Sequence, residues 1–354
     1  MTDADVVVVG LGPAGATAAR VIAGSGARVM AFDRKREAGK PVQCAELIPR
    51  IISPEAGDVH SALRQRIDDM QTFVERELAD CTPNFPGHMI DRAAFDAKLV
   101  EYASGAGASC RLGTFVRAID DTGLVITSKR ERVNARIIIG ADGPHSLVGR
   151  AIGVGNTEFA ETRQITVDLI APYTATDIFL SSEIVGGYGW LFPKRTMANL
   201  GIGVSAAYKE DLKPLLKNLH DRLANEGRVG RRVLGITGGA IPVGGIKGPV
   251  GYLGRTPVLL TGDAAGLANP ITGAGINAAV ISGALAGEAA LRWLDGDRLI
   301  LRDYRDGIED LFKPGIDRAL RHRERLRSYY DVGTRPPPGA LRQSWIAYDS
   351  YWKN

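Results

Sequence analysis

The 354-residue sequence contains little cysteine and no long uninterrupted hydrophobic run. Its three cysteines, Cys44, Cys81 and Cys110, are odd in number and widely spaced, and they form no Cys-x-x-Cys pair or Cys/His cluster. This pattern excludes a disulfide framework and a zinc site, so we predict no metal and a reducing compartment. The most apolar region, residues 258–291, is broken by polar residues, a proline and several glycines, and should not span a membrane.

A strong charge of one sign and a targeting segment are lacking as well. The net charge of +4 is small for this length, and no RNA- or DNA-binding motif is present, so we expect no nucleic-acid partner. The N-terminus, MTDADVVVVG, places two acids before a short apolar run, which is unlike a signal or transit peptide. We expect a cytoplasmic protein and leave open its attachment to a membrane surface. No oligomeric state is predicted.

Glycine, in contrast, is abundant, and its first cluster has a recognisable pattern. A β-branched run over residues 5–10, a helical stretch over 13–26 and a second short apolar run over 27–34 predict a βαβ unit. Between the first strand and the helix stand Gly10, Gly12 and Gly15 as G-x-G-x-x-G. This spacing provides a tight turn, close approach of a pyrophosphate to the backbone and close helix–strand packing. The helix N-terminus adds free N–H groups for the phosphates.

Asp33 ends the second strand, where its carboxylate can accept hydrogen bonds from a ribose. Nicotinamide and flavin dinucleotides share this pattern, so further segments must decide. Two more predicted buried strands end in polar glycine turns: GADGPHSLVGR over residues 140–150, and LLTGDAAGLANPITGAGINAAV over 259–280. Each could be an ordinary turn with a helix cap, but three nucleotide-like strand ends in this order predict a dinucleotide site.

These three segments resemble the FAD-dependent group that contains p-hydroxybenzoate hydroxylase. The resemblance implies that Asp142-Gly143 lies at the pyrophosphate, that Asp263 contacts the ribityl–pyrophosphate portion, and that Arg92 helps to hold FAD. The turn at 273–277 would place backbone N–H groups beside the flavin pyrimidine edge, where reduced flavin is anionic. The candidate FAD-binding residues are Gly10, Gly12, Pro13, Ala14, Gly15, Asp33, Arg34, Cys44, Arg92, Asp142, Gly143, Gly262, Asp263, Pro270, Gly273, Ala274, Gly275 and Ile276.

Two other stretches, PVQCAE (residues 41–46) and YGWLFPK (188–194), resemble signatures of the geranylgeranyl reductase family. This resemblance covers about residues 1–300. It implies an enzyme that uses reduced FAD to saturate carbon–carbon double bonds in isoprenoid chains of a diphosphate, an ether lipid or a quinone. The electron donor implied is NAD(P)H or ferredoxin. The sequence departs from the family in having Cys44-Ala45-Glu46-Leu47 where Cys-Gly-Glu-Gly is common.

Tyr188, Trp190 and Phe192 alternate with other residues and would share one face of a strand. There they would form an apolar wall for an isoprenoid substrate, with Tyr188 and Trp190 also assigned to the catalytic group; the alternative is an aromatic stripe in a core. Lys194 at the strand end could meet a phosphate or be solvated. Among substrate-binding residues we also place Glu46, with a surface carboxylate as the alternative.

Cys44 lies in a loop flanked by proline and polar residues rather than in an apolar run. A free cysteine is most often a small buried hydrophobe. The family resemblance instead implies a position beside the flavin ring, where the thiol could position the alkene or supply a proton. We therefore assign Cys44 to both the catalytic and the cofactor-binding group.

The expected fold class is α/β with an α+β insert: a Rossmann-like FAD-binding domain, an inserted antiparallel-sheet substrate domain and a C-terminal helical tail. Residues 160–205 alternate as antiparallel strands do, and residues 39–90 show too little periodicity for regular structure. We assign 1–70, 91–155 and 250–300 to the FAD domain, 71–90 and 156–249 to the substrate domain, and 301–354 to the tail.

The tail contains RALRHRERLRSYY over residues 318–330, a basic helix that could rest on anionic lipid or present a solvated face. Two other functions stay open at this point. One is a flavin-dependent aromatic monooxygenase or halogenase, although no Trp-x-Trp-x-Ile-Pro signature is present. The other is a flavoprotein that only passes electrons to a quinone or a partner protein.

Overall fold

In the computed structural model, which describes residues 2–353, the N-terminal valine run forms strand β1 (Thr2–Val9) inside an eight-stranded sheet. Its main path has the order β17-β18-β11-β1-β2-β8, and β9 and β10 continue from β11. Val6, Val7 and Val8 have no exposed surface, because both faces of the sheet are covered. The other strands of this sheet are β2 (Val29–Phe32), β8 (Ser109–Arg111), β9 (Val116–Ile119), β10 (Val125–Thr127), β11 (Arg132–Gly140), β17 (Val250–Leu253) and β18 (Thr256–Leu260).

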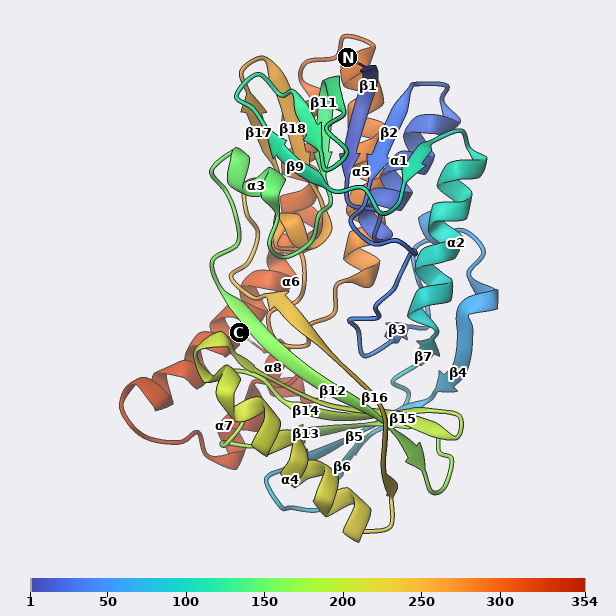
Figure 1. Cartoon of the computed structure of the whole chain (residues 1–354). Coiled ribbons are helices and arrows are strands. Elements are labelled where there is room, and N and C mark those ends of the chain that lie inside the picture. The colour runs from blue at the N-terminus through green and yellow to red at the C-terminus, as the bar shows by residue number, and fades with distance from the viewer. Residues whose placement is uncertain (1, 354) are drawn as a thin grey trace.

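Helices α1 (Pro13–Gly24) and α5 (Ile276–Leu294) pack closely together on this sheet, although they are distant in sequence (Figure 1). A Cβ atom at Gly283 of α5 would lie 2.2 Å from the Ala14 carbonyl oxygen of α1. Helices α2 (Arg92–Gly105) and α3 (Leu147–Ala151) complete this half of the molecule. The small residues of α5 therefore allow its backbone to lie close to the backbone of α1.

A seven-stranded sheet with the order β16-β12-β15-β14-β13-β5-β6 forms the second half. Its pairs are antiparallel except for β13 with β5. Helix α4 (Leu212–Asn225) covers its outer face, and the inner face turns toward the first half (Figure 1). The strands are β5 (Asp69–Val74), β6 (Asp80–Thr82), β12 (Phe159–Leu169), β13 (Ala175–Leu180), β14 (Gly189–Lys194), β15 (Met197–Ser205) and β16 (Val229–Pro242).

The expectation of irregular structure over residues 39–90 is wrong. Strands β3 (Leu47–Pro49), β7 (Gly87–Ile90) and β4 (Leu63–Ile67) form a three-stranded sheet there. Strands β5 and β6 of the same region join the seven-stranded sheet. These strands are three to six residues long, which is too short for an alternating pattern to stand out in the sequence.

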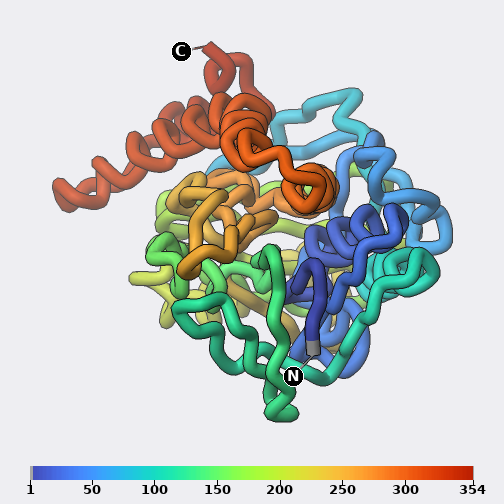
Figure 2. The backbone as a smooth tube through the Cα atoms, turned by 90° about the horizontal axis from the view of Figure 1, so that it is seen from above, coloured from blue at the N-terminus to red at the C-terminus, as the bar shows by residue number. Residues whose placement is uncertain are grey.

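The C-terminal region is helical: α6 (Ile300–Asp331), α7 (Pro338–Gln343) and α8 (Asp349–Trp352). The far end of α6 projects from the body before the chain returns through α7 (Figures 1 and 2). Within residues 2–353, no helix combines the length and apolar character needed to cross a bilayer. The predicted fold class, a Rossmann-like domain with an antiparallel-sheet insert and a helical tail, is confirmed.

Candidate functional site

Four parallel strands of the large sheet end side by side, which brings the predicted nucleotide residues to one edge. Val9 of β1 is in register with Phe32 of β2 and with Gly140 of β11, and Gly140 is in register with Leu260 of β18. The residues that follow these strand ends therefore meet: Gly10, Asp33, Ala141-Asp142 and Thr261-Gly262-Asp263. This alignment follows from the register of the parallel strands.

The three glycines of the first turn differ in what surrounds them. Gly10 has φ +98°, and a Cβ there would lie 2.2 Å from the Ala141 carbonyl oxygen. A Cβ on Gly15 would lie 1.9 Å from the Gly10 oxygen, whereas one on Gly12 would meet nothing within 4 Å among the described residues. Gly10 and Gly15 thus allow tight packing, and Gly12 leaves an open backbone surface. Pro13 begins α1 at the first helical position, where a backbone N–H would have no partner within the helix and its absence in proline costs nothing.

Asp33 holds the glycine turn in place. Its Oδ2 accepts a hydrogen bond from the Leu11 N–H at 2.7 Å, and its Oδ1 accepts one from the Lys35 N–H at 2.7 Å. Each carboxylate oxygen keeps further acceptor capacity for a ribose. A basic hollow of about 500 Å³ follows in the chain, lined by Arg34, Lys35, Arg36, Glu37, Lys40, Pro41 and Gln43.

Asp142 lies at the predicted edge but works as a helix cap. It accepts hydrogen bonds from the Ser146 hydroxyl at 2.5 Å and from the Leu147 N–H at 2.6 Å, at the start of α3. Burial raises the pKa of the Asp142 carboxyl, and these donors oppose the rise. Asn156 then ties two turns together, because its amide donates to the carbonyls of Pro144 and Asp263 at 3.0 and 2.8 Å.

The turn before α5 is fixed by its own hydrogen bonds. The Asn269 side chain accepts from the N–H groups of Ile271 and Thr272, both at 3.0 Å. Gly273 has φ +71°, and the helix begins at Ile276 after Gly275, which offers no capping side chain. The first turn of α5 therefore presents N–H groups and a positive dipole end toward the space between the two halves.

Arg92 occupies the centre of the site. Its Nε donates to Asp96 Oδ1 at 2.6 Å, and Asp96 is 2% exposed. Burial lowers the pKa of the Arg92 guanidinium, but Asp96 and the adjacent Cys44 thiol outweigh it and hold the pKa above its usual range. Burial likewise raises the pKa of the Asp263 carboxyl, with Arg92 opposing the rise. The Arg92 guanidinium thus lies within electrostatic reach of both Cys44 and Asp263.

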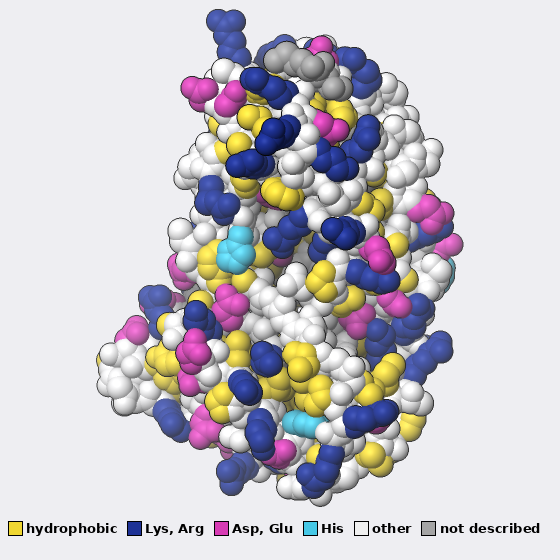
Figure 3. All heavy atoms as spheres, viewed as in Figure 1, with side chains coloured by type: hydrophobic (Ala, Val, Ile, Leu, Met, Phe, Trp, Pro, Cys, Tyr) yellow, Lys and Arg dark blue, Asp and Glu magenta, His cyan; other side chains and the backbone are white. Residues whose placement is uncertain are grey.

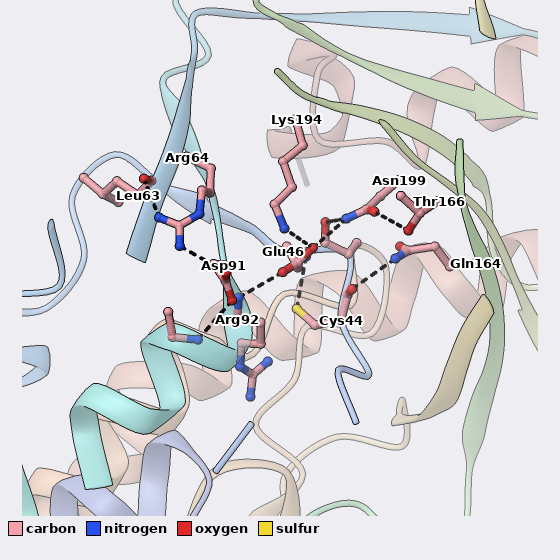
Figure 4. A network of polar contacts seen from close by, with 12 residues as sticks. Cys44, Glu46, Leu63, Arg64, Asp91, Arg92, Gln164, Thr166, Lys194 and Asn199 are labelled. Carbon is pink, nitrogen blue, oxygen red and sulfur yellow. Dashed lines mark hydrogen bonds and ion pairs between the residues drawn. The ribbon is translucent and has the colours of Figure 1, made fainter. Parts of the chain in front are cut away.

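The Cys44 loop is held against the inner face of the seven-stranded sheet (Figure 4). Cys44 Sγ accepts the Glu46 N–H at 3.2 Å, and Glu46 has φ +68°. The Glu46 carboxylate accepts from Lys194 Nζ at 2.7 Å, from Asn199 Nδ2 at 3.0 Å and from the Arg92 N–H at 2.9 Å. Glu46 and Lys194 therefore form a largely buried ion pair close to Cys44 (Figure 4).

The three aromatic side chains lie together, and Trp190 and Phe192 are buried in an apolar cluster, which is what the alternative of an aromatic stripe in a core expects. The ring centroids of Tyr188 and Trp190 are 5.8 Å apart, and those of Trp190 and Phe192 are 6.3 Å apart. Trp345, from the segment after α7, packs on Tyr188 at 4.8 Å. The Tyr188 hydroxyl donates to the Thr272 carbonyl at 2.7 Å, and burial raises its pKa. The wall is thus joined directly to the turn that precedes α5.

Sequence reasoning missed the polar side chains that link the seven-stranded sheet to the Cys44 loop: Gln164, Asn199 and Thr237. Gln164 and Thr166 alternate with buried apolar residues in RQITVDL, which is the pattern of a solvent-facing row. The structure instead turns this row toward the loop, because both faces of the sheet are covered. The alternation alone could not reveal the difference.

These features fit FAD. The open backbone at Gly12, the two helix N-termini at one edge, and Asp33 at the end of β2 match the pyrophosphate and ribose of a dinucleotide. The α5 N-terminus and Arg92 suit the anionic edge of a reduced flavin, and the Tyr188 hydroxyl reaches the turn that precedes α5. Fold and site together define an FAD-dependent oxidoreductase.

Comparison with known proteins narrows this class. The FAD binding domain family matches residues 3–175, and the geranylgeranyl reductase catalytic domain family matches residues 160–241. Digeranylgeranylglycerophospholipid reductase 1 of Methanopyrus kandleri is 34% identical over 347 residues, covering 91% of this chain and 90% of the relative. The corresponding reductase of Thermoplasma volcanium is 32% identical over 340 residues, covering 87% and 84%. The chain belongs to the geranylgeranyl reductase family of FAD-dependent oxidoreductases, as its motifs predicted.

Solved structures agree with this assignment. A geranylgeranyl bacteriochlorophyll reductase-like protein from Thermoplasma acidophilum superposes with a TM-score of 0.83 at 25% identity, covering 99% of this chain and 92% of that one. The flavin-dependent brominase Bmp2 has a TM-score of 0.70 at 16% identity, covering 94% and 88%. This second likeness concerns the fold alone.

Proposed function

We propose that this enzyme saturates carbon–carbon double bonds in the geranylgeranyl chains of an ether-type glycerophospholipid. The observation that carries the proposal is the hydrogen bond from Tyr188 to Thr272, which joins an aromatic wall to the turn before α5. An isoprenoid chain along Trp190 and Phe192 would lie beside that turn. The relatives named above carry names that specify a digeranylgeranylglycerophospholipid, and a diphosphate or prenylated quinone would present the same chain.

In this proposal each group of the site has a separate role. Bound reduced FAD supplies the hydride. Cys44 gives a proton to the alkene, and Arg92, beside it, stabilises the thiolate until a proton returns from solvent. The aromatic residues exclude water and orient the chain. Glu46 and Lys194, being paired with each other, hold the loop, which leaves the lipid headgroup to cations nearer the surface.

The electrons come from NAD(P)H or from reduced ferredoxin. Anaerobic mixing of the oxidised holoenzyme with NADH, NADPH or reduced ferredoxin, followed at the flavin absorbance band, distinguishes these donors. We expect bleaching with one of them at a rate no slower than lipid turnover. Bleaching with none of them would contradict this part of the proposal.

The decisive experiment uses the purified protein with its FAD. Dithionite-reduced enzyme is incubated anaerobically with digeranylgeranylglycerophospholipid, geranylgeranyl diphosphate or a prenylated quinone, and the products are weighed by mass spectrometry. We expect a gain of two mass units for each double bond, with the phospholipid reacting fastest. Oxygen insertion into an aromatic substrate in air, without any alkene reduction, would instead indicate a monooxygenase.

A further inference from the structure

Resting on this proposed function, we propose that Gln164 is a positioning residue that fixes the Cys44 loop relative to the Trp190 indole. Gln164 lies on β12 and is 4% exposed. Its Oε1 accepts the Trp190 Nε1–H at 3.1 Å, and its Nε2 donates to the Cys44 carbonyl at 3.3 Å. One amide therefore joins the substrate wall to the proposed proton donor.

The strand register explains why the indole reaches this amide. Gln164 is opposite Gly201 on β15, and Gly201 is opposite Trp190 on β14. A Cβ at position 201 would lie 2.2 Å from Trp190 Cζ2. The indole thus lies across β15 in the space that the missing side chain leaves, and its N–H arrives at β12.

Two neighbours of Gln164 hold the same loop from adjacent strands. Thr237 of β16, directly opposite Gln164, donates from its hydroxyl to the Val42 carbonyl. Asn199 of β15 donates to the Ala45 carbonyl at 3.2 Å. The carbonyls of Val42, Cys44 and Ala45 therefore all point at the sheet, and Figure 4 shows Gln164 and Asn199 directed toward the loop.

The chemistry of the position requires a primary amide. The indole offers only a donor, and the Cys44 carbonyl offers only an acceptor, so the side chain between them must accept at one end and donate at the other. The hydrogen bond to Trp190 is buried and the one to Cys44 is partly buried, so a donor or acceptor left without its partner there would lower stability. Among residues of this length, glutamine alone supplies both functions without a charge.

The test measures the reactivity of Cys44 rather than lipid turnover. Holoenzyme is treated with iodoacetamide between pH 6 and 9, and the Cys44 and Cys81 peptides are quantified by mass spectrometry. Cys81, exposed on β6, is the internal reference. In Gln164→Leu we expect Cys44 to react about tenfold faster than in the wild type, because the loop opens more often once its amide bond is lost.

Thr176→Val is the matched control. Thr176 is fully buried on β13, and its hydroxyl finds no hydrogen-bond partner among residues 2–353. The change removes a buried polar atom from the same sheet without touching the loop, so Cys44 should react at the wild-type rate. An equal acceleration in Gln164→Leu and Thr176→Val would reduce Gln164 to a general packing residue and overturn the proposal.

Trp190→Phe provides a second test, which does not require the Gln164→Leu variant to fold. It keeps a ring but removes the indole N–H, and we expect Cys44 to react about threefold faster, whereas the double variant with Gln164→Leu should react no faster than Gln164→Leu alone. Additive effects, or an unchanged rate in Trp190→Phe, would refute the coupling. The assay contains no lipid, so a failure of the proposed lipid reduction would appear separately, in the turnover of the wild type.

Discussion

At the scale of single residues, Cys44 offers the most direct test of chemistry. In Cys44→Ala we expect FAD to stay bound, because the thiol accepts a hydrogen bond from the Glu46 N–H and lies beside Arg92 without supporting a strand. Alkene reduction should fall at least ~100-fold, as for the loss of a general acid. The measurements are the flavin absorbance per protein and the initial rate of lipid reduction. Cys81→Ala, on an exposed strand, is the control, and unchanged turnover in Cys44→Ala would return this thiol to a packing role.

The Glu46–Lys194 ion pair makes a separate prediction about stability. The two side chains are 8% and 18% exposed, so Glu46→Gln leaves a mostly buried ammonium group without its counter-charge. We expect the free energy of unfolding in urea to fall by about 3 kcal/mol. Adding Lys194→Met should recover most of this loss, since the double variant buries no unpaired charge.

A surface ion pair provides the comparison for that experiment. Lys217 and Asp221 on α4 are 72% and 47% exposed, and Asp221→Asn should change the free energy of unfolding far less than Glu46→Gln does, because solvent screens the exposed pair. If Glu46→Gln lowers the free energy of unfolding no more than Asp221→Asn does, the Glu46–Lys194 ion pair does not hold the Cys44 loop in place.

At the scale of a strand, β15 carries two glycines on the face that meets Trp190. A methyl group at Gly201 would lie 2.2 Å from the indole, whereas one at Gly203 would find its nearest neighbour, a Thr162 methyl, at 3.5 Å. Gly201→Ala must push the indole out of its place, and we expect it to lower stability by about 1–3 kcal/mol and to weaken lipid reduction. Gly203→Ala should fold and turn over like the wild type. Equal stability and equal lipid reduction in the two variants would mean that the indole can shift to another position without cost.

At the scale of helix packing, His322 of α6 anchors α8. Its Nε2 lies 3.0 Å from the Tyr351 carbonyl, and its ring stacks on Tyr351 at 4.4 Å. Burial lowers the pKa of His322, the Tyr351 carbonyl opposes this, and Arg325, Arg321 and Arg318 lower the pKa further.

The sign of the pH effect follows from that lowered pKa. Below pH ~6.5 the unfolded chain binds a proton at His322 that the folded chain resists, so stability is present above this pH and is lost as the pH falls toward the folded pKa. Between about pH 5 and 7, the free energy of unfolding should rise less steeply with pH in His322→Gln than in the wild type. The two slopes should differ by at most ~1.4 kcal/mol for each pH unit, the limit for one titrating group. The measurement is urea unfolding at three pH values in both proteins; parallel slopes would contradict the prediction.

At the scale of the whole molecule, the sequence predicted the nucleotide-binding half well and the contacts between the halves poorly. The glycine spacing and the valine run of β1 are local features, and they dictate the turn and the buried strand by themselves. Gln164 illustrates the opposite case, because its role depends on which strands neighbour β12 and on what covers the sheet. The sequence likewise left Lys194 free to bind a phosphate. In the structure it pairs with Glu46, which lies 148 residues earlier in the chain, and no local pattern could predict that contact.

Surface charge is distributed over the whole molecule and gives one last prediction. On the face shown in Figure 3, Lys and Arg side chains are spread over both halves with acids between them. The C-terminal half of α6 adds Arg321 and Arg325, which are exposed, and Val332, which follows the helix, is 73% exposed. This combination of cations and an apolar tip suits an anionic membrane surface, from which a lipid substrate would be drawn.

We therefore expect the holoenzyme to sediment with phosphatidylglycerol-containing vesicles and to be released by salt, because exposed charge pairs are screened within about 10 Å at 0.1 M ionic strength. Arg321→Ala with Arg325→Ala should lower the partition coefficient about 30-fold, at about 1 kcal/mol for each arginine near the surface. Arg302→Ala with Arg305→Ala removes the same charge from the other end of α6 and should leave binding nearly unchanged. Equal losses in the two double variants would show that net charge, rather than the C-terminal half of α6, governs the association.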